Sequence, residues 1–331
     1  MRLARPAIFF SALILASVVV VFVSLRNGAV EVSWGEMFGG GDSTGGRVFR
    51  VMRIPRTLMG FLCGGALGIC GAALQGLFRN PLADPALVGV SGGAALGAVV
   101  GIVIAGPLMG ASPFVLPICA FLGALAATFL VQAIASQNGR VLVSTLLLAG
   151  IAVNALTGAG IGWMIYGAND SQLRDFTFWS LGSIAGASWS HVLACFPFII
   201  LSVAILLWRA RALNALSLGE SDAWHMGAPV EAAKRSILAA SALAVGAGTA
   251  FTGTIGFIGL VAPHVVRMFC GADHRLVLPA SFLVGGCLLS GADVLARIAR
   301  APAEVPVGIV VATIGAPFFV ALLLRGKGHG L

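Results

Sequence analysis

Long stretches without a charged side chain dominate the pattern of hydrophobic and polar positions along this chain. The longest covers 55 residues, from Pro85 to Gly139, without Asp, Glu, Lys or Arg. A water-exposed helix would place polar residues on its outer face every few positions. Because about 20 apolar residues are enough for a helix to cross the hydrocarbon core, this stretch predicts two crossings. Gly106 and Pro107 are among the residues that interrupt the pattern between them.

The same pattern recurs along the rest of the chain and predicts ten spans. The composition agrees, since 59% of the 331 residues are hydrophobic and only 10% are charged. We therefore predict the all-α class: a polytopic transmembrane helical bundle, with residues 1–331 forming a single transmembrane domain. A short outer helix is expected within residues 176–190. The spans are expected at residues 6–25, 57–78, 87–105, 114–135, 142–166, 190–208, 236–252, 256–268, 276–297 and 305–324.

The placement of Lys and Arg predicts the orientation in the membrane. With the N-terminus inside, twelve of these residues lie on inner segments and eight on outer ones, which favours cytoplasmic N- and C-termini. The net charge of +8 is scattered between spans rather than gathered into a stripe, so nucleic acid is not an expected partner. The first outer segment is an exception that predicts a docking surface. It holds five arginines: Arg26, Arg47, Arg50, Arg53 and Arg56.

Polar residues inside the spans are few and predict helix packing rather than chemistry. Asp293 and Arg297 are four residues apart and are expected to pair on one helix face. Gln75 and Asn154 are expected to form hydrogen bonds between helices. Glycines recur every four residues in two spans and predict close helix contacts. They are Gly60, Gly64 and Gly68 in one span, and Gly93, Gly97 and Gly101 in the next.

The sequence contains no catalytic or nucleotide-binding motif. It lacks a P-loop and the G-x-S-x-G and H-E-x-x-H patterns, and its six cysteines form no C-x-x-C pair. We therefore expect no catalytic residue, no metal site and no cofactor bound by this chain. If the protein pumps a substrate, a partner must supply the energy.

Several longer motifs, in a fixed order, point to one family. RIPR stands at residues 53–56 and QGLFRNPLADP at 75–85, followed by LVGVS at 87–91. ALSLGE at 215–220, GFIGLVAPH at 256–264 and AEVPVGI at 303–309 come later. Over nearly the whole chain, this series resembles the permease subunits of the ABC importers for cobalamin, iron-siderophores and haem.

The resemblance implies an assembly with partners on both membrane faces. Such permeases are homodimers with ten helices per subunit in the lipid of the bacterial inner membrane. Two cytoplasmic ATPase subunits use ATP and Mg, and a periplasmic binding protein delivers the haem or iron chelate. By resemblance, residues 213–229 form cytoplasmic coupling helices that contact the ATPase. The coupling residues are Leu216, Leu218, Gly219, Glu220, Met226 and Gly227, and the arginines that dock the binding protein are Arg53, Arg56 and Arg297.

The cargo is less narrowly defined than the family. Residues 170–183 look most like the haem-uptake members, so haem is the predicted cargo, with a ferric siderophore or cobalamin as alternatives. A secondary transporter driven by an ion gradient is the alternative from another class. It would ordinarily need a carboxylate or a broken-helix ion site within the membrane. A membrane-embedded enzyme is a third class, for which the chain offers no nucleophile, base or metal cluster.

Overall fold

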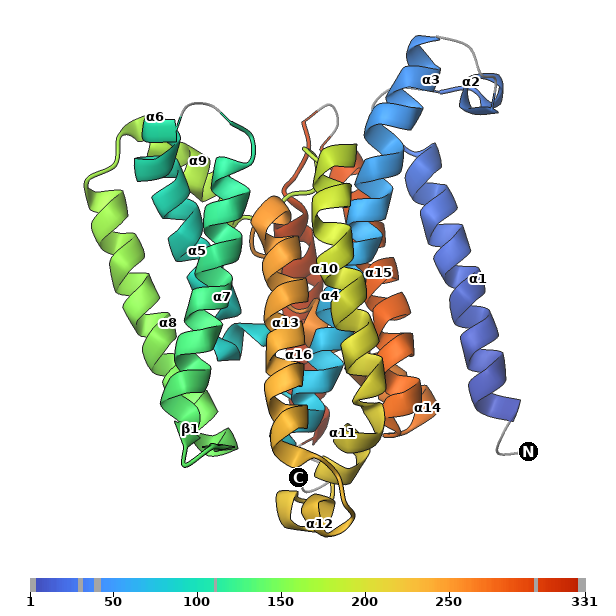
Figure 1. Cartoon of the computed structure of the whole chain (residues 1–331). Helices are drawn as coiled ribbons and strands as arrows, with labels where there is room; N and C mark the ends of the chain where they lie inside the picture. The colour runs from blue at the N-terminus through green and yellow to red at the C-terminus, as the bar shows by residue number, and fades with distance from the viewer. Residues whose placement is uncertain (1–3, 29–31, 39–42, 110–111, 301–302, 327–331) are drawn as a thin grey trace.

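The computed structural model describes residues 4–28, 32–38, 43–109, 112–300 and 303–326. Arg2 and Lys327, counted above among the inner basic residues, lie outside these ranges. The predicted all-helical polytopic fold is confirmed (Figure 1). Its long or apolar helices are α1 (Ala4–Arg26), α4 (Ile54–Phe78), α5 (Val90–Val100), α7 (Val115–Ala135), α8 (Val143–Tyr166), α10 (Trp189–Trp208), α13 (Val230–Thr252), α14 (Ile258–Cys270), α15 (His274–Ile298) and α16 (Val307–Gly326).

Shorter elements join these helices and define the two ends of the molecule. One end carries α11, α12 and the β1–β2 hairpin, and we call it the α12 end. The other carries α3, α6 and α9, and we call it the α9 end (Figure 1). The short elements are α2 (Trp34–Phe38), α3 (Thr44–Val48), α6 (Gly106–Met109), α9 (Asp170–Ser180), α11 (Ala210–Leu216), α12 (Glu220–His225), the π-helices η1 (Phe49–Arg53) and η3 (Gly101–Ala105), the 3₁₀-helix η2 (Pro85–Val88), β1 (Ser136–Gln137) and β2 (Arg140–Val141).

Eight helical segments in the described ranges are long and apolar enough to cross a membrane, and two further apolar helices are shorter. α14 has 13 residues, which is about 20 Å at 1.5 Å per residue. It begins after a non-helical stretch in which Gly253 and Phe257 both have positive φ. Hydrogen bonds within the protein hold this stretch and its surroundings, as from Thr254 Oγ1 to the Ser180 carbonyl. The predicted eighth span is therefore a short helix with an irregular entry.

The helix of the second span is longer than the hydropathy predicted. α3, η1 and α4 form one continuous helical segment of 35 residues from Thr44 to Phe78, so much of the first outer segment is helical. Pro55 has no backbone N–H, and the widened turn η1 precedes it. The same device precedes Pro107, where η3 lets the helix continue to Met109. The expected break at Gly106 and Pro107 is therefore wrong.

The short outer helix is also displaced from its expected position. α9 starts at Asp170 because Asn169 and Gln172 form a capping box at its beginning. It ends at Ser180, and Gly182 follows with a φ of 72°, a conformation that suits glycine. The residues from 183 to the start of α10 are thus a connection rather than a helix.

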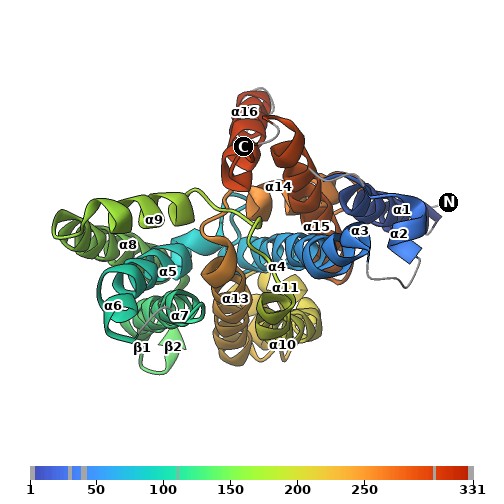
Figure 2. The same cartoon turned by 90° about the horizontal axis from the view of Figure 1, so that it is seen from above.

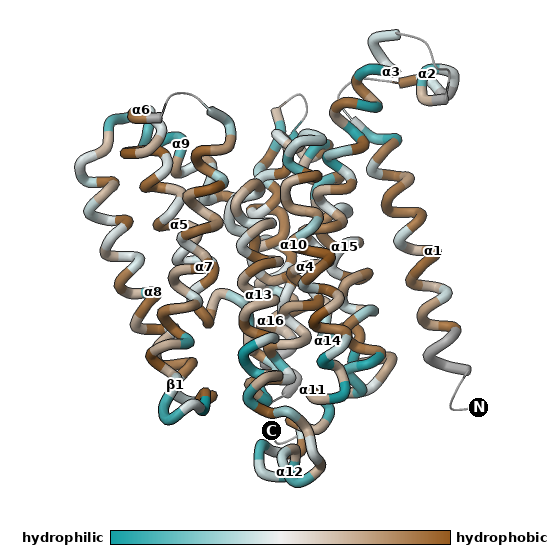
Figure 3. The backbone as a smooth tube through the Cα atoms, viewed as in Figure 1, coloured by the Kyte–Doolittle hydropathy of each residue, from teal (hydrophilic) through white to brown (hydrophobic). Residues whose placement is uncertain are grey.

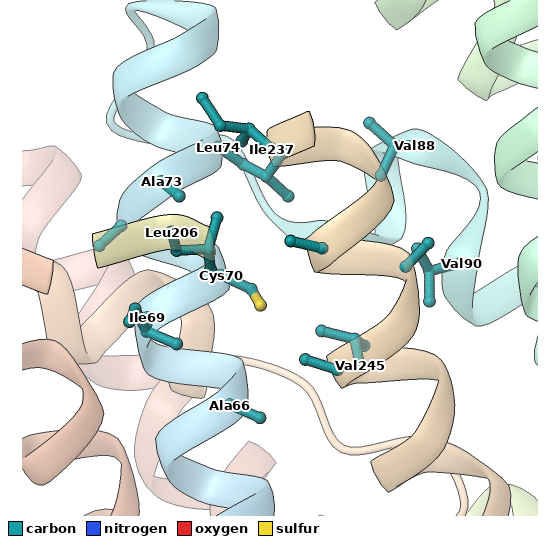
Figure 4. Packing of buried hydrophobic residues seen from close by; sticks show 14 of the residues in the cluster. Ala66, Ile69, Cys70, Ala73, Leu74, Val88, Val90, Leu206, Ile237 and Val245 are labelled. Atoms are coloured by element: carbon teal, nitrogen blue, oxygen red, sulfur yellow. The ribbon is translucent and has the colours of Figure 1, made fainter. Parts of the chain in front are cut away.

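α4 lies in the middle of the bundle, with α1 at one flank and α5, α7 and α8 at the opposite flank (Figure 2). Its residues Ile69, Cys70 and Leu74 pack near Leu206 of α10 and Ile237 of α13 (Figure 4). Hydrophobic residues cover the sides of the helices, whereas polar residues gather at the two ends (Figure 3). This distribution is what a lipid-embedded bundle requires.

The glycine faces allow the closest helix contacts, as predicted. A Cβ added at Gly64 would collide with the Gly285 carbonyl oxygen of α15, and one at Gly68 with the Ser281 carbonyl oxygen. Gly93 of α5 faces Gly123 of α7 in the same way. Backbones approach here to a distance that only glycine permits.

The two predicted interhelical amides are confirmed as well. Gln75 donates to the Gly259 carbonyl oxygen at 3.1 Å, and its own side-chain oxygen accepts from Arg267. Asn154 donates to the Ala86 carbonyl oxygen at 2.9 Å. Gln75 satisfies a carbonyl group that Pro263, which has no N–H, leaves without its helical partner, and Asn154 adds a second donor to the Ala86 carbonyl, which already accepts from the Gly89 N–H.

Candidate functional site

Two short helices, α11 and α12, form the tip of the α12 end (Figure 1). The resemblance predicted helices within residues 213–229, and the structure has two on either side of Gly219, the first of which begins earlier, at Ala210. Gly219 has a φ of 131°, which a residue with a side chain adopts only under strain. Its backbone therefore sets the angle between the two helices.

The predicted coupling residues divide into an exposed group and a buried group. Leu218 and Met226 are 64% and 56% exposed, and Trp224 beside them is 69% exposed. Leu216 is buried and holds α11 against the bundle. Gly227 ends α12 with a positive φ of 78°. Three large apolar side chains at a helical tip form a surface suited to a protein partner.

Hydrogen bonds fix α11 to the start of α15. The Asn214 side chain donates to Asp273 Oδ1 at 2.6 Å and accepts from the backbone N–H of His274 at 2.8 Å. Hydrogen bonds from Arg275 are the main cause that lowers the pKa of Asp273 to about 2. The carboxylate is therefore charged at neutral pH and can accept the Asn214 hydrogen bond under physiological conditions.

Glu220 pairs with a buried lysine although its own side chain is 41% exposed. Its Oε2 lies 2.6 Å from Nζ of Lys234 on α13. Beside this pair lies a groove of about 690 Å³ between α12, the start of α13 and the hairpin. Lys234 has no predicted role, although the chain has only two lysines and Glu231 stands three residues before it.

Charged residues at the α9 end form a connected cluster of two arginines and two carboxylates. Arg56 donates through Nε and Nη2 to Asp293, with Nη2 2.8 Å from Oδ1. Its third arm, Nη1, reaches Glu304 at 2.9 Å. Arg297 pairs with Asp293 at 2.7 Å, which confirms the pair predicted from their spacing. Glu304 is a member of this cluster that the sequence analysis missed.

Arg53 and Arg297 contact the end of α1. Arg53 Nη1 donates to the carbonyl oxygens of Leu25 and Arg26 at 3.0 and 2.9 Å. Arg297 Nη1 donates to those of Ser24 and Asn27 at 3.0 and 2.6 Å. Both arginines are buried, at 5% and 8% exposed. They satisfy carbonyl groups that the last turn of a helix leaves without partners.

The helix α8 presents a large uncovered surface. Few of its residues are buried, and Trp163 and Tyr166 near its α9 end are 78% and 88% exposed. Together with Ala159 and Gly162 they line an open hollow of about 560 Å³. Aromatic faces of this kind can stack on a flat apolar cargo.

Comparison with known proteins agrees with the sequence motifs. A family model described as the FecCD transport family matches residues 13–325. The hemin transport system permease protein HmuU of Yersinia pestis is 41% identical over 98% of this chain and 97% of its own length. The cobalamin import system permease protein BtuC of Halobacterium salinarum is 44% identical over 82% of this chain and 72% of its own length. The vitamin B12 import system permease protein BtuC of Klebsiella pneumoniae is 40% identical over 84% of this chain and 83% of its own length.

A solved structure gives the same result for the fold. A metal-chelate type ABC transporter in an inward-facing conformation superimposes with a TM-score of 0.87 and 31% identity, covering 97% of this chain and 99% of that one. The helical bundle and these matches thus define the permease of a binding-protein-dependent ABC importer for haem, cobalamin or siderophores. The chain belongs to the FecCD transport family.

Family membership decides between the classes that the sequence left open. A permease subunit of this family is a transmembrane component without an ATPase domain, and ATP is used by a partner ATPase. The protein is therefore a multi-pass membrane subunit and not an enzyme. Family membership excludes a secondary transporter driven by an ion gradient.

Proposed function

We propose that this permease carries haem across the bacterial inner membrane. The observation that supports this most directly is the match to the hemin permease, which extends over 98% of this chain and 97% of the relative. The cobalamin permeases named above match over 82% and 84% of the chain. A ferric siderophore or cobalamin remains the alternative cargo in the same role.

The uncovered part of α8 supports a bulky, largely apolar cargo. Trp163 and Tyr166 lie at the α9 end of the helix, where a cargo delivered from outside would arrive. Haem is a flat macrocycle, and such rings stack on exposed aromatic side chains. Weak stacking without metal ligation also allows release, which a transport path needs.

The proposed assembly has a second copy of this chain, two ATP-binding cassette subunits and a periplasmic binding protein for haem or an iron chelate. We place the α12 end in the cytoplasm, together with both termini, and the α9 end in the periplasm. The excess of Lys and Arg on the segments assigned to the inside supports this orientation. The apolar sides of the helices contact membrane lipid.

The proposed ATPase site is the tip formed by α11 and α12. Leu218 and Met226 would contact the ATPase directly, because they are exposed and apolar. Gly219 and Gly227 would set the shape of the tip through their positive φ angles. Leu216 would hold α11 in place from within, and Glu220 would anchor α12 to α13 through Lys234.

The proposed docking site for the binding protein is the arginine cluster at the α9 end. Arg56 is the member with an arm directed to a partly exposed carboxylate, Glu304. Arg53 and Arg297 would contribute mainly through their charge and by holding the end of α1. The cluster of Arg56, Arg297, Asp293 and Glu304 is itself neutral, and Arg53 beside Arg297 brings the net charge of the five residues to +1, which attracts acidic groups on a partner.

Uptake into reconstituted vesicles tests the cargo. Vesicles that contain the permease and its ATPase are supplied with ATP inside and the cognate binding protein outside, and each cargo is offered separately. We expect haem to accumulate, with accumulation lost when either ATP or the binding protein is omitted. Faster uptake of cobalamin or of a ferric siderophore than of haem would contradict the haem assignment and identify the cargo.

A further inference from the structure

We propose that Lys234 ties α12, the β1–β2 hairpin and the start of α13 into one mechanical unit, so that a displacement of α12 is transmitted to α8. This proposal rests on the proposed role of α12 as the helix that the ATPase moves. It assigns Lys234 a positioning role, since Lys234 lies away from the exposed patch and from the cargo surface.

The ammonium group of Lys234 has three N–H donors, and each finds an acceptor on a different element. Nζ lies 2.6 Å from Glu220 Oε2 on α12, 2.7 Å from the Val141 carbonyl oxygen on β2, and 3.0 Å from Glu231 Oε1 on α13. The side chain is 1% exposed. No donor is left over, so the group joins three elements at a single point.

Two further hydrogen bonds hold the hairpin to α13. The second carboxylate oxygen of Glu231 accepts from the Val141 backbone N–H at 2.8 Å. Arg235 Nη2 donates to the Gly139 carbonyl oxygen at 2.7 Å. The hairpin itself is closed by pairing of Ser136 with Val141 and of Gln137 with Arg140. The hairpin is therefore held to α13 through β2 and its turn, and β1 is held through its pairing with β2.

The choice of residue type supports a specific role at this point. The sequence has eighteen arginines and only two lysines, Lys234 and Lys327. A guanidinium is planar and presents its donors as a fork, whereas an ammonium directs three donors to separate points. Three acceptors around one atom match the ammonium. A buried charge that loses its partners is strongly destabilising, so the three elements are held together.

The hairpin passes directly into α8, which starts at Val143, two residues after the acceptor Val141. Leu142 between them donates its N–H to the Ala135 carbonyl oxygen at 3.0 Å and so locks the end of α7 to the start of α8. α8 is mostly uncovered by the rest of the chain. A displacement of α12 must therefore break the Glu220–Lys234 ion pair or the Lys234–Val141 hydrogen bond, or else carry the hairpin and the base of α8 with it.

A distance measurement between α12 and the hairpin tests the tie directly. Spin labels are placed at the exposed positions Ser221 and Gln137 through unnatural amino acids, so that the native cysteines remain. In the full-length permease with its ATPase, we expect one narrow distance distribution that is the same without nucleotide and with trapped ATP. Lys234→Met and Lys234→Arg should both broaden it, whereas Arg211→Met, an exposed arginine of α11, should not.

Uptake and ATP hydrolysis give the functional half of the test. We expect Lys234→Met to lower uptake at least tenfold while hydrolysis and assembly with the ATPase persist. If that variant does not fold, Glu220→Gln keeps the side-chain shape, removes one charge and should show a weaker form of the same uncoupling. A distance distribution in Lys234→Met that equals the wild-type one would overturn the tie. Normal uptake by Leu218→Asp would remove the coupling role of α12 but leave the tie itself standing.

Discussion

The two ends of the molecule offer partners very different surfaces. At the α12 end, Leu218, Trp224 and Met226 expose apolar side chains beyond the bundle. At the α9 end, the proposed docking site is a cluster of charged groups, in which Nε, Nη1 and Nη2 of Arg56 all donate to Asp293 or Glu304. The tip of α12 is apolar and uncovered by this chain, whereas the arginine cluster at the α9 end is ionic and paired internally.

This difference indicates which kind of complex each end can form. Burying an exposed Leu or Met side chain is worth about 1.5–3 kcal/mol, and obligate interfaces are the more hydrophobic ones. A partner at the α9 end must instead replace ion pairs that already exist, so it gains orientation and speed more than affinity. The surfaces suit a resident ATPase at one end and a binding protein that comes and goes at the other.

The largest effect is expected from Leu218→Asp. A carboxylate in the middle of an apolar interface must lose its water without gaining a partner, so the affinity for the ATPase should fall about 100-fold, or about 3 kcal/mol. Co-purification and titration of labelled ATPase measure this. Leu218→Met keeps an apolar side chain of similar size and should assemble normally. Equal assembly of the Asp and Met variants would show that the exposed patch is not the ATPase site.

Reversal of Arg56 should have the next largest effect, and it acts on the other end. Arg56→Glu places a third carboxylate beside Asp293 and Glu304, and we expect binding-protein affinity to fall about 30-fold, or about 2 kcal/mol. The matched control is Arg174→Glu, an exposed arginine of α9 at the same end. A thermal melt of both variants separates lost docking from lost folding. If both reversals weaken binding equally, the effect is one of overall charge and the cluster has no special role.

The features of the two ends that depend on local interactions could be predicted from the sequence, whereas those that depend on contacts between distant segments could not. The spans and the Asp293–Arg297 pair follow from local patterns of hydropathy and spacing, and the helices within residues 213–229 follow from the family resemblance. Helix ends were less predictable, because a charge ends the apolar run without ending the helix. Arg47 and Arg50, for example, lie on helical turns that continue outward from α4.

The environment of the arginines proposed for docking could not be predicted from the sequence, for a different reason. Arg53 and Arg297 are buried because the end of α1 packs beside them and presents unpaired carbonyl groups. That contact joins segments about 30 and 270 residues apart. Lys234 was missed although it carried a signal: it is a lysine in a chain that otherwise uses arginine, three residues after Glu231. A lysine of this kind indicates nearby acceptors even at the edge of an apolar run, as the three around Lys234 show.

Salt concentration should affect partner binding at the two ends differently. Raising the salt concentration from about 0.1 M to about 1 M shortens the Debye length from about 10 Å to about 3 Å. We expect binding-protein affinity to fall about tenfold, through a slower association rate. ATPase retention should not fall, because apolar burial is not screened. Stopped-flow association and size-exclusion profiles across the series measure both, and a parallel loss at the two ends would contradict the contrast drawn between them.

The smallest effect is expected from Glu304→Gln. Glu304 pairs with Nη1 of Arg56 and is 33% exposed. Removing its charge raises the net charge of the cluster together with Arg53 from +1 to +2. The side-chain oxygen of Gln can still accept from Nη1. The association rate of the binding protein should rise about threefold at low salt, and the gain should vanish at high salt. Asp175→Asn removes an exposed carboxylate of α9 at the same end and should change the rate less. A slower association in Glu304→Gln would mean that Glu304 orients Arg56 for the partner rather than competing with it.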